Sequence, residues 1–178
     1  EVLPFHSSLR RAYIHNDAND YNLLVVKNRV AGLIDFGDMV YSHLINNVAV
    51  ACTYAMLNTP DPLHAAALVV KGYHEKYPLT EKEIELLYYL IAGRLCISVT
   101  RSAYNASLNS DNAHHFITEK PAWDLLFKLI RINPVAAHNA FRIAAGFSPV
   151  INEDDNYEEI LNERKKYIGR NLSISYKK

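Results

Sequence analysis

The 178-residue sequence has only two cysteines and no apolar run long enough to cross a membrane. Cys52 and Cys96 neither form a dense disulfide framework nor have the spacing of zinc ligands. Both lie in apolar stretches with helical spacing, so we expect buried thiols in a reducing compartment. No segment reaches about 18 consecutive apolar residues, and the N-terminus lacks the charged and apolar regions of a secretory signal. These absences favour a cytoplasmic protein with no membrane partner.

An excess of one charge is also missing. Lysine plus arginine and aspartate plus glutamate number 19 each, which gives a net charge of zero. Nothing in this balance marks a polyanionic partner such as nucleic acid. The basic residues 164–166 stand among glutamates, which is typical of a solvated helix face. With no internal repeat and no low-complexity segment, the length fits one domain with its own core.

Short apolar segments predict strands near the N-terminus, at residues 13–14, 22–26 and 30–34. The polar residues 27–29 between the last two can make a tight turn, so this pair is predicted to form a β-hairpin. Pairing across the turn would bring Asn22 and Asp35 to the same end of the hairpin.

From residue 42 onward the apolar spacing is helical. Ser42 is predicted to cap the first of these helices, Thr80 with Glu83 forms a capping-box signature, and Pro121 suits a first helical position. Residues 105–118 lack apolar periodicity and predict a loop that faces the substrate. The predicted helices cover residues 42–57, 62–77, 80–103, 121–130, 134–146 and 157–168, and an extended tail follows at 170–178.

Residues 15–22, His-Asn-Asp-Ala-Asn-Asp-Tyr-Asn, carry the pattern that phosphoryl transfer requires, together with Leu-Ile-Asp-Phe-Gly-Asp at 33–38. Transfer from ATP needs an aligned hydroxyl, metal ions on the phosphates and a base. Asp17 lies in a loop five residues before Asn22 and is the predicted base. His15 is predicted to fix this loop through hydrogen bonds from its imidazole.

The same segments offer oxygen ligands for magnesium, which typically takes one or two carboxylates and completes its shell with phosphates and water. Asp35 would supply a charged oxygen and Asn22 a neutral one, to a metal shared with ATP. Asp38 either contacts the metal or a substrate ammonium group, or caps the following helix. Asp20 is a second candidate for substrate contact.

The pattern His-x-Asp-x-x-x-x-Asn, followed by Ile-Asp-Phe-Gly-Asp, resembles the aminoglycoside phosphotransferase and choline kinase-like branch of the protein-kinase-like fold. In that family the first aspartate is the base, and the asparagine and second aspartate bind magnesium; the match places these roles on Asp17, Asn22 and Asp35. The sequence of residues 16–22 and 32–40 is similar to that of a subgroup that includes hydroxylysine kinases. Similar domains occur fused to class III aminotransferases, which use pyridoxal phosphate, and residues 167–173 resemble the junction.

This resemblance implies the mainly α-helical C-terminal lobe of a kinase with one small β-hairpin. Residues 1–168 would form the lobe, with the loop and hairpin at 13–38 and a helical part at 42–168, and residues 169–178 a tail or linker. The parent protein would phosphorylate a hydroxyl of an amino-bearing metabolite such as hydroxylysine or a related amino alcohol. The alternative is a non-catalytic module of a multidomain aminotransferase.

The family also uses a lysine in an N-terminal lobe to hold the ATP phosphates, and no lysine precedes Lys27. We therefore expect that lobe to lie outside this sequence and this chain alone to be inactive. Two arginines remain open in role: Arg94 and Arg101 lie seven residues apart on one predicted helix face. They suit a structural salt bridge or contact with a substrate carboxylate.

Overall fold

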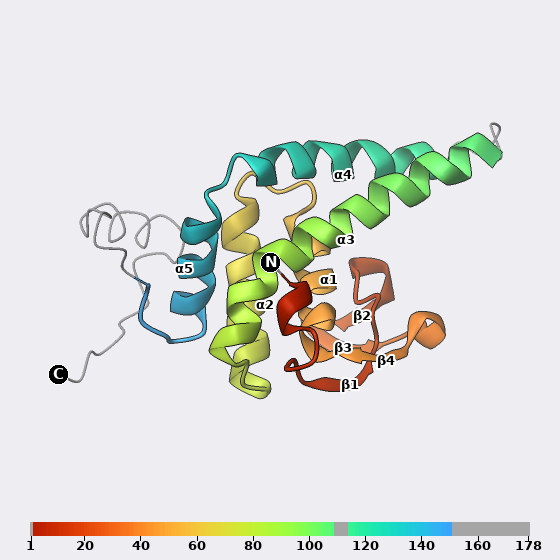
Figure 1. The fold of residues 1–178 in the computed structure, drawn as a ribbon. Coiled ribbons are helices and arrows are strands. Elements are labelled where there is room, and N and C mark those ends of the chain that lie inside the picture. Colours follow the sequence, from red (N-terminus) through yellow and green to blue (C-terminus); the bar gives the residue numbers. More distant parts are fainter. Residues whose placement is uncertain (1, 109–113, 151–178) are drawn as a thin grey trace.

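The structure, a computed structural model, describes residues 2–108 and 114–150, with side chains described for 2–104 and 120–150. In this part of the chain the fold is mainly helical with two antiparallel strand pairs (Figure 1). The predicted helix at 157–168, the tail at 169–178 and the junction at 167–173 lie outside the described residues. The elements are β1 (Arg11–Ile14), β2 (Leu23–Val26), β3 (Arg29–Leu33), β4 (Val40–His43), α1 (Leu44–Met56), α2 (Pro62–Lys76), α3 (Glu81–Leu108), α4 (His114–Ile130) and α5 (Pro134–Ala144).

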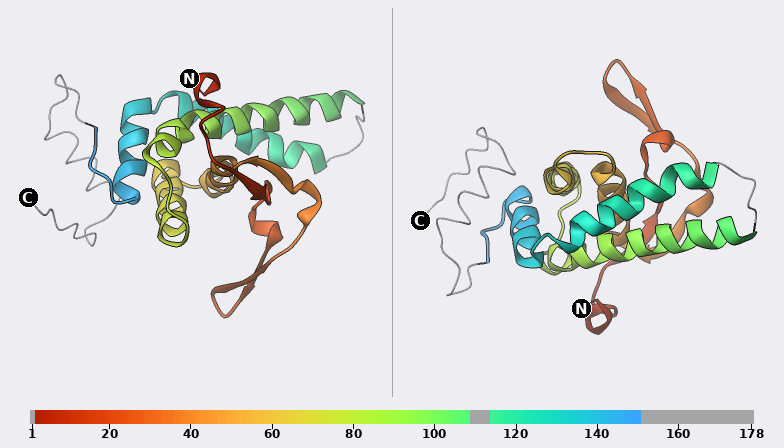
Figure 2. Two further views of the ribbon diagram at one scale, coloured as in Figure 1. Left: turned by 60° about the horizontal axis from the view of Figure 1, so that its bottom comes forward. Right: turned by 90° about the horizontal axis from the view of Figure 1, so that it is seen from above.

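The predicted hairpin is confirmed as β2 paired with β3, from Leu23 opposite Leu33 to Val26 opposite Arg29. Lys27 and Asn28 connect the strands with φ angles of 50° and 60°. Two consecutive positive φ angles are typical of the tight turns whose twist matches a hairpin. The hairpin projects away from the helices (Figure 2).

The second strand pair, β1 with β4, corrects the prediction of a helix capped by Ser42. Ser42 lies in β4 opposite Ala12, and α1 begins after His43, which makes no side-chain capping bond. Val40 and Tyr41 pair with residues of β1, and such β-branched and aromatic side chains favour strands. The lobe therefore has two strand pairs rather than a single hairpin.

The predicted starts of three helices are confirmed, and the structure shows a capping group at each. Asp61 accepts a bond from the His64 amide at 3.1 Å ahead of α2. Before α3, the Thr80 amide donates to Glu83 Oε2 at 2.8 Å and the Glu83 amide donates to Thr80 Oγ1 at 3.2 Å, the reciprocal pair of a capping box. Asn133 accepts from the Val135 amide at 2.8 Å before α5.

The predicted loop at residues 105–118 is largely wrong. Helix α3 continues to Leu108 and α4 begins at His114, so only residues 109–113, which are not described, separate the two helices. Pro121 accordingly lies inside α4 and not at its first position. An internal proline costs about 3 kcal/mol or more. Helices α3 and α4 lie side by side along most of their length (Figures 1 and 2), and this packing offsets the cost.

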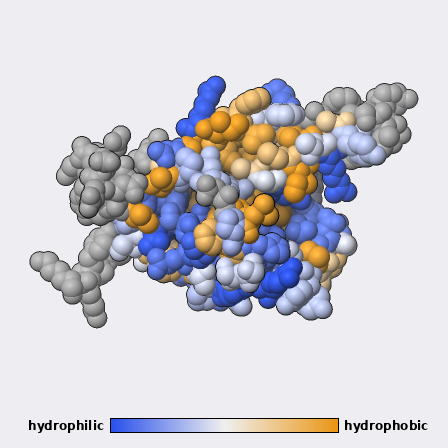
Figure 3. All heavy atoms as spheres, viewed as in Figure 1, coloured by the Kyte–Doolittle hydropathy of each residue, from blue (hydrophilic) through white to orange (hydrophobic). Residues whose placement is uncertain are grey.

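The core lies among α1, α2, α3 and α5, with the inner side of α4 completing it. Residues with no exposed surface come from several of these helices: Ile45, Val48, Cys52, Val70, Ile84, Leu87, Ile91, Leu95 and Ala137. The outer side of α4 differs, since Phe127 and Ile130 are exposed and apolar residues gather over this helix in Figure 3. None of the helices in the described ranges is long and apolar enough to span a membrane.

The two cysteines have different surroundings. Cys52 is fully buried, as predicted, and this burial raises the pKa of its thiol. Cys96 is exposed on α3, so the prediction of a buried thiol is wrong there. It lies next to the buried Leu95 but on the outward side of the helix.

Candidate active site

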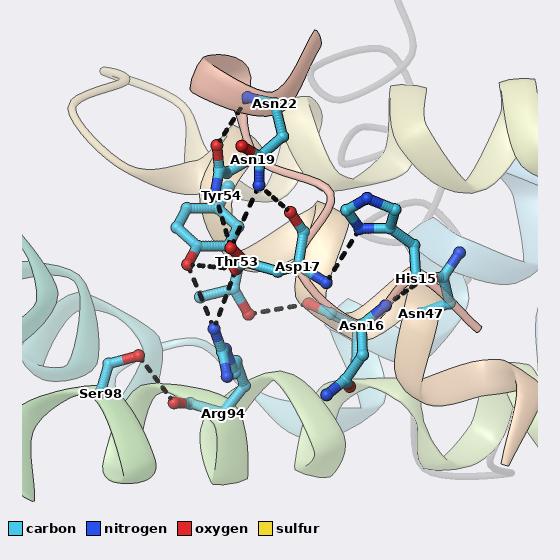
Figure 4. A network of polar contacts seen from close by, with 11 residues as sticks. His15, Asn16, Asp17, Asn19, Asn22, Asn47, Thr53, Tyr54, Arg94 and Ser98 are labelled. Carbon is cyan, nitrogen blue, oxygen red and sulfur yellow. Dashed lines mark hydrogen bonds and ion pairs between the residues drawn. The ribbon is translucent and has the colours of Figure 1, made fainter. Parts of the chain in front are cut away.

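The carboxylate of Asp17 is held by four donors from three parts of the chain (Figure 4). Its Oδ1 accepts from the Tyr54 hydroxyl at 2.8 Å and from Arg94 Nη2 at 3.4 Å. Its Oδ2 accepts from Asn19 Nδ2 at 3.0 Å and Asn22 Nδ2 at 3.2 Å. The side chain is 20% exposed. Asp17 is thus fixed in orientation yet reachable from solvent.

The four contacts to the Asp17 carboxylate differ in how easily another donor can replace them. A carboxylate has about four lone-pair positions, and the four donors use them all. Any further donor to this carboxylate must therefore replace one of the four, and the 3.4 Å contact from Arg94 is the longest. Hydrogen bonds weaken as they lengthen beyond about 3.2 Å, so this contact is the one that yields at the lowest cost.

Asn22 is a buried part of the same loop, at the end of a short 3₁₀ helix, Asp20–Asn22. Its Nδ2 donates to the Asp17 carbonyl oxygen at 2.9 Å as well as to the carboxylate. Its amide donates to Asn19 Oδ1 at 3.0 Å. Because Nδ2 is used within the loop, Oδ1 is the atom of Asn22 that is suited to a cation.

His15 connects this loop to the hairpin. Its Nδ1 accepts the Asp17 amide at 3.3 Å, which leaves the proton on Nε2, 2.9 Å from the Ile34 carbonyl oxygen. The ring also meets Phe36 edge to face, with centroids 5.0 Å apart. His15 is 7% exposed. These contacts agree with the predicted anchoring of the loop and make His15 a positioning residue for Asp17.

Asp35 lies where β3 ends, in a left-handed backbone conformation with φ 60° and ψ 73°. Its Oδ1 accepts from the Gly37 amide at 3.3 Å and caps the 3₁₀ helix Phe36–Asp38. The Ile34 amide donates to the Asn22 carbonyl oxygen at 2.9 Å, so Asn22 and Asp35 lie at the same end of the hairpin, as predicted. Left-handed non-glycine residues cost about 1–3 kcal/mol and cluster at functional sites.

The donor set at this end of the hairpin fits magnesium. No cluster of three or more histidine, cysteine, aspartate or glutamate side chains occurs in the ranges that the structure describes. One carboxylate and one carboxamide oxygen suit an ion that takes its other ligands from phosphates and water.

The remaining aspartates of the motif are exposed, Asp20 at the start of its 3₁₀ helix and Asp38 at the end of the next. Asp38 does not cap the following helix, since β4 lies between it and α1. The capping alternative for Asp38 is thus wrong. Contact of either side chain with a substrate remains a prediction.

Several groups around Asp17 were not found from the sequence. Tyr54 lies on α1, and burial, followed by its bond to Asp17, raises its pKa. Asn47, on the same helix, accepts the Asn16 amide at 3.1 Å. Arg94, on α3, is the exception, since its contact with Asp17 is the salt bridge that the sequence analysis gave as one of two alternatives. Tyr54 occupies an ordinary helical position, so no local signal marked it.

Comparison with known proteins agrees with the geometry. Residues 1–83 match the profile described as the phosphotransferase enzyme family. The chain belongs to this family. A kinase-like fold follows from that membership. No solved structure matches the chain significantly.

Similar curated proteins are also phosphotransferases, and their matches cover more of the chain. Hydroxylysine kinase of Xenopus laevis is 33% identical over 133 residues, which cover 68% of this chain and 36% of the relative. The Bos taurus enzyme is 32% identical over 133 residues, which cover 69% of this chain and 35% of the relative. The Mus musculus enzyme is 31% identical over 139 residues, which cover 72% of this chain and 37% of the relative. The chain is distantly related to these kinases and spans a little over a third of their length.

Proposed function

We propose that the protein carrying this chain is an ATP- and magnesium-dependent phosphotransferase acting on a hydroxyl of a small amino-bearing metabolite, with hydroxylysine or a related amino alcohol as the acceptor. The observation that carries the proposal is the Asp17 carboxylate, oriented by four donors. The names of the relatives motivate the choice of acceptor.

In this proposal Asp17 is the general base. Its carboxylate accepts the hydroxyl proton while the substrate oxygen bonds to the γ-phosphorus of ATP, and the bond from that phosphorus to the β–γ bridging oxygen breaks to release ADP. Such assistance is worth roughly 10²–10⁴ in rate. Tyr54 and Asn19 keep the carboxylate in place through bonds of 2.8 and 3.0 Å.

Asn22 Oδ1 and the Asp35 carboxylate would hold magnesium. When bound, the ion neutralises charge on the phosphate oxygens. His15 fixes the relation between the two ligands and the base, since it bonds both the Asp17 amide and the Ile34 carbonyl. We expect residues outside this sequence to supply the other contacts to ATP, since the match covers only 36% and 35% of these relatives.

The test is ADP release by the full-length protein with ATP, magnesium and a panel of amino alcohols and hydroxy amino acids. We expect turnover that falls by a factor of roughly 10²–10⁴ in Asp17→Ala. Asp124→Ala is a matched control, because Asp124 is an exposed carboxylate on α4 that pairs with Lys120. Absence of turnover with every acceptor, or equal rates for Asp17→Ala and the control, would refute the proposal.

A further inference from the structure

A cavity of about 240 Å³ lies between the end of α1, the middle of α3 and α4. Its volume is below the roughly 300–1,000 Å³ of pockets for drug-sized ligands, so it suits a small metabolite. The residues that carry the argument are Tyr54, Arg94, Ser98 and Arg101.

The cavity adjoins the predicted base. Tyr54 and Arg94 line it, and both bond Oδ1 of Asp17. Figure 4 shows Arg94 and Ser98 on one helix beneath the Asp17 carboxylate. Tyr54 and Arg94 therefore stand between the cavity and the Asp17 carboxylate, and a hydroxyl that replaces the 3.4 Å contact from Arg94 would bond Asp17 from the cavity side.

The charges in the wall favour a ligand that carries a negatively charged group. Two arginines line the cavity and no aspartate or glutamate does. Arg94 is compensated by Asp17, and its Nη2 also donates to the Tyr54 hydroxyl oxygen at 3.1 Å. Arg101 forms no ion pair with any residue in the part of the chain that the structure describes, and it is exposed. One full positive charge thus remains at the cavity.

The chemistry of Arg101 suits a carboxylate. A guanidinium is permanently charged, and its planar fork matches a carboxylate with two parallel hydrogen bonds. Arg94 and Arg101 are seven residues apart, which is two helical turns or about 10 Å along the axis of α3. This separation favours an acceptor whose carboxylate lies several bonds from the reacting hydroxyl.

We propose that the cavity binds the phosphate acceptor and that Arg101 pairs with a carboxylate on it, which makes the substrate class hydroxylated amino acids rather than amino alcohols without an acid group. The proposal rests on the proposed function and deepens it. Arg94 orients Asp17, and Arg101 selects the acceptor.

The experiment compares Arg101→Gln and Arg101→Lys in the full-length protein, with hydroxylysine and its decarboxylated analogue as acceptors. We expect Arg101→Gln to raise KM for hydroxylysine tenfold or more with little change in kcat, to leave KM for the analogue unchanged, and Arg101→Lys to recover part of the loss. Arg131→Gln is the control, since Arg131 is an exposed arginine beyond α4 and outside the cavity wall. An equal rise for both acceptors, a rise in KM for ATP alone, or no change would overturn the assignment.

A binding measurement separates this inference from the proposed function. Calorimetric titration with hydroxylysine, without ATP, should show affinity that Arg101→Gln weakens tenfold or more and that the Asp124→Ala control retains. Such binding in a protein without turnover would refute the kinase proposal and keep the carboxylate site. Turnover of hydroxylysine with binding unaffected by Arg101→Gln would keep the kinase proposal and refute the site.

Discussion

The hydroxyl of Tyr54 donates a 2.8 Å hydrogen bond to Oδ1 of Asp17, and Arg94 Nη2 lies 3.1 Å from the same hydroxyl oxygen. Two helices, α1 and α3, thus deliver polar groups to one carboxylate in the loop after β1. Because burial and the bond to Asp17 raise the pKa of Tyr54, the phenol keeps its proton and remains a donor at neutral pH.

Tyr54→Phe tests what this bond contributes. The substitution keeps the ring and removes the donor, and a hydrogen bond to a charged group is worth about 1.5–3 kcal/mol. We expect kcat to fall by a factor of about 10–100 with KM for ATP nearly unchanged, measured by ADP release from the full-length protein. Tyr104→Phe serves as a control for loss of a tyrosine hydroxyl on an exposed ring of α3. An increase in kcat would show that Tyr54 blocks the carboxylate instead of orienting it.

The sequence predicted features that depend on neighbouring residues. The hairpin follows from two apolar segments around a polar turn, and the start of α3 follows from Thr80 and its partner Glu83 three residues away. The closeness of Asn22 and Asp35 follows from strand pairing alone. Each is a local rule that tertiary packing reinforces.

Features that depend on distant residues were missed. The contact of Tyr54 with Asp17 arises from how α1 packs beside the loop, and no spacing rule relates the two positions. The pairing of β1 with β4 joins segments separated by the whole motif. Helix α4 also extends before Pro121, although a proline inside a helix removes a backbone hydrogen bond. Packing of α4 on α3 outweighs this loss.

A second prediction concerns the ion pair that joins the start of β1 to α3. Glu83 is 1% exposed and accepts from Arg10 Nε at 2.9 Å, from Arg10 Nη2 and from the Thr80 amide. Removing one partner of a buried pair costs about 3–5 kcal/mol, and the 38% exposure of Arg10 reduces this figure. We expect Glu83→Ala to lower the free energy of unfolding by about 2–4 kcal/mol in urea titration.

The control for this pair is Glu85→Ala, since Glu85 forms an exposed pair with Lys82 on the same helix. Exposed pairs contribute about 0–1 kcal/mol. Equal effects of the two substitutions would contradict a special role for the buried carboxylate.

A third prediction concerns acid sensitivity at His138 on α5. Burial, then the charge of Arg142, lowers its pKa below the usual 6.5, and its Nε2 is buried without a hydrogen-bond partner among the described residues. The charges of Glu85 and Glu81 raise this pKa, and the charge of Lys82 lowers it further. The unfolded state therefore binds a proton more readily, and stability falls as pH drops below about 6.5.

His138→Leu removes this titrating group and an unpaired buried nitrogen. Unfolding midpoints measured between pH 7.5 and 5 should fall less steeply in the variant than in the wild type. His64→Leu is the comparison, since it removes a histidine from a different helix, α2. A parallel course of wild type and His138→Leu across this range would refute the role of His138.

The last prediction concerns Asp35 and magnesium. Asparagine tolerates the left-handed conformation almost as well as aspartate does, so Asp35→Asn removes one negative charge at φ 60° without adding backbone strain. A metal ion contributes several kcal/mol of charge stabilisation to the transferred phosphoryl group. We therefore expect kcat to fall by about 10²-fold or more and the magnesium concentration for half-maximal rate to rise. Asp124→Asn should leave both unchanged. If Asp35→Asn retained its rate and its magnesium dependence while its unfolding midpoint stayed that of the wild type, Asp35 would not be a metal ligand.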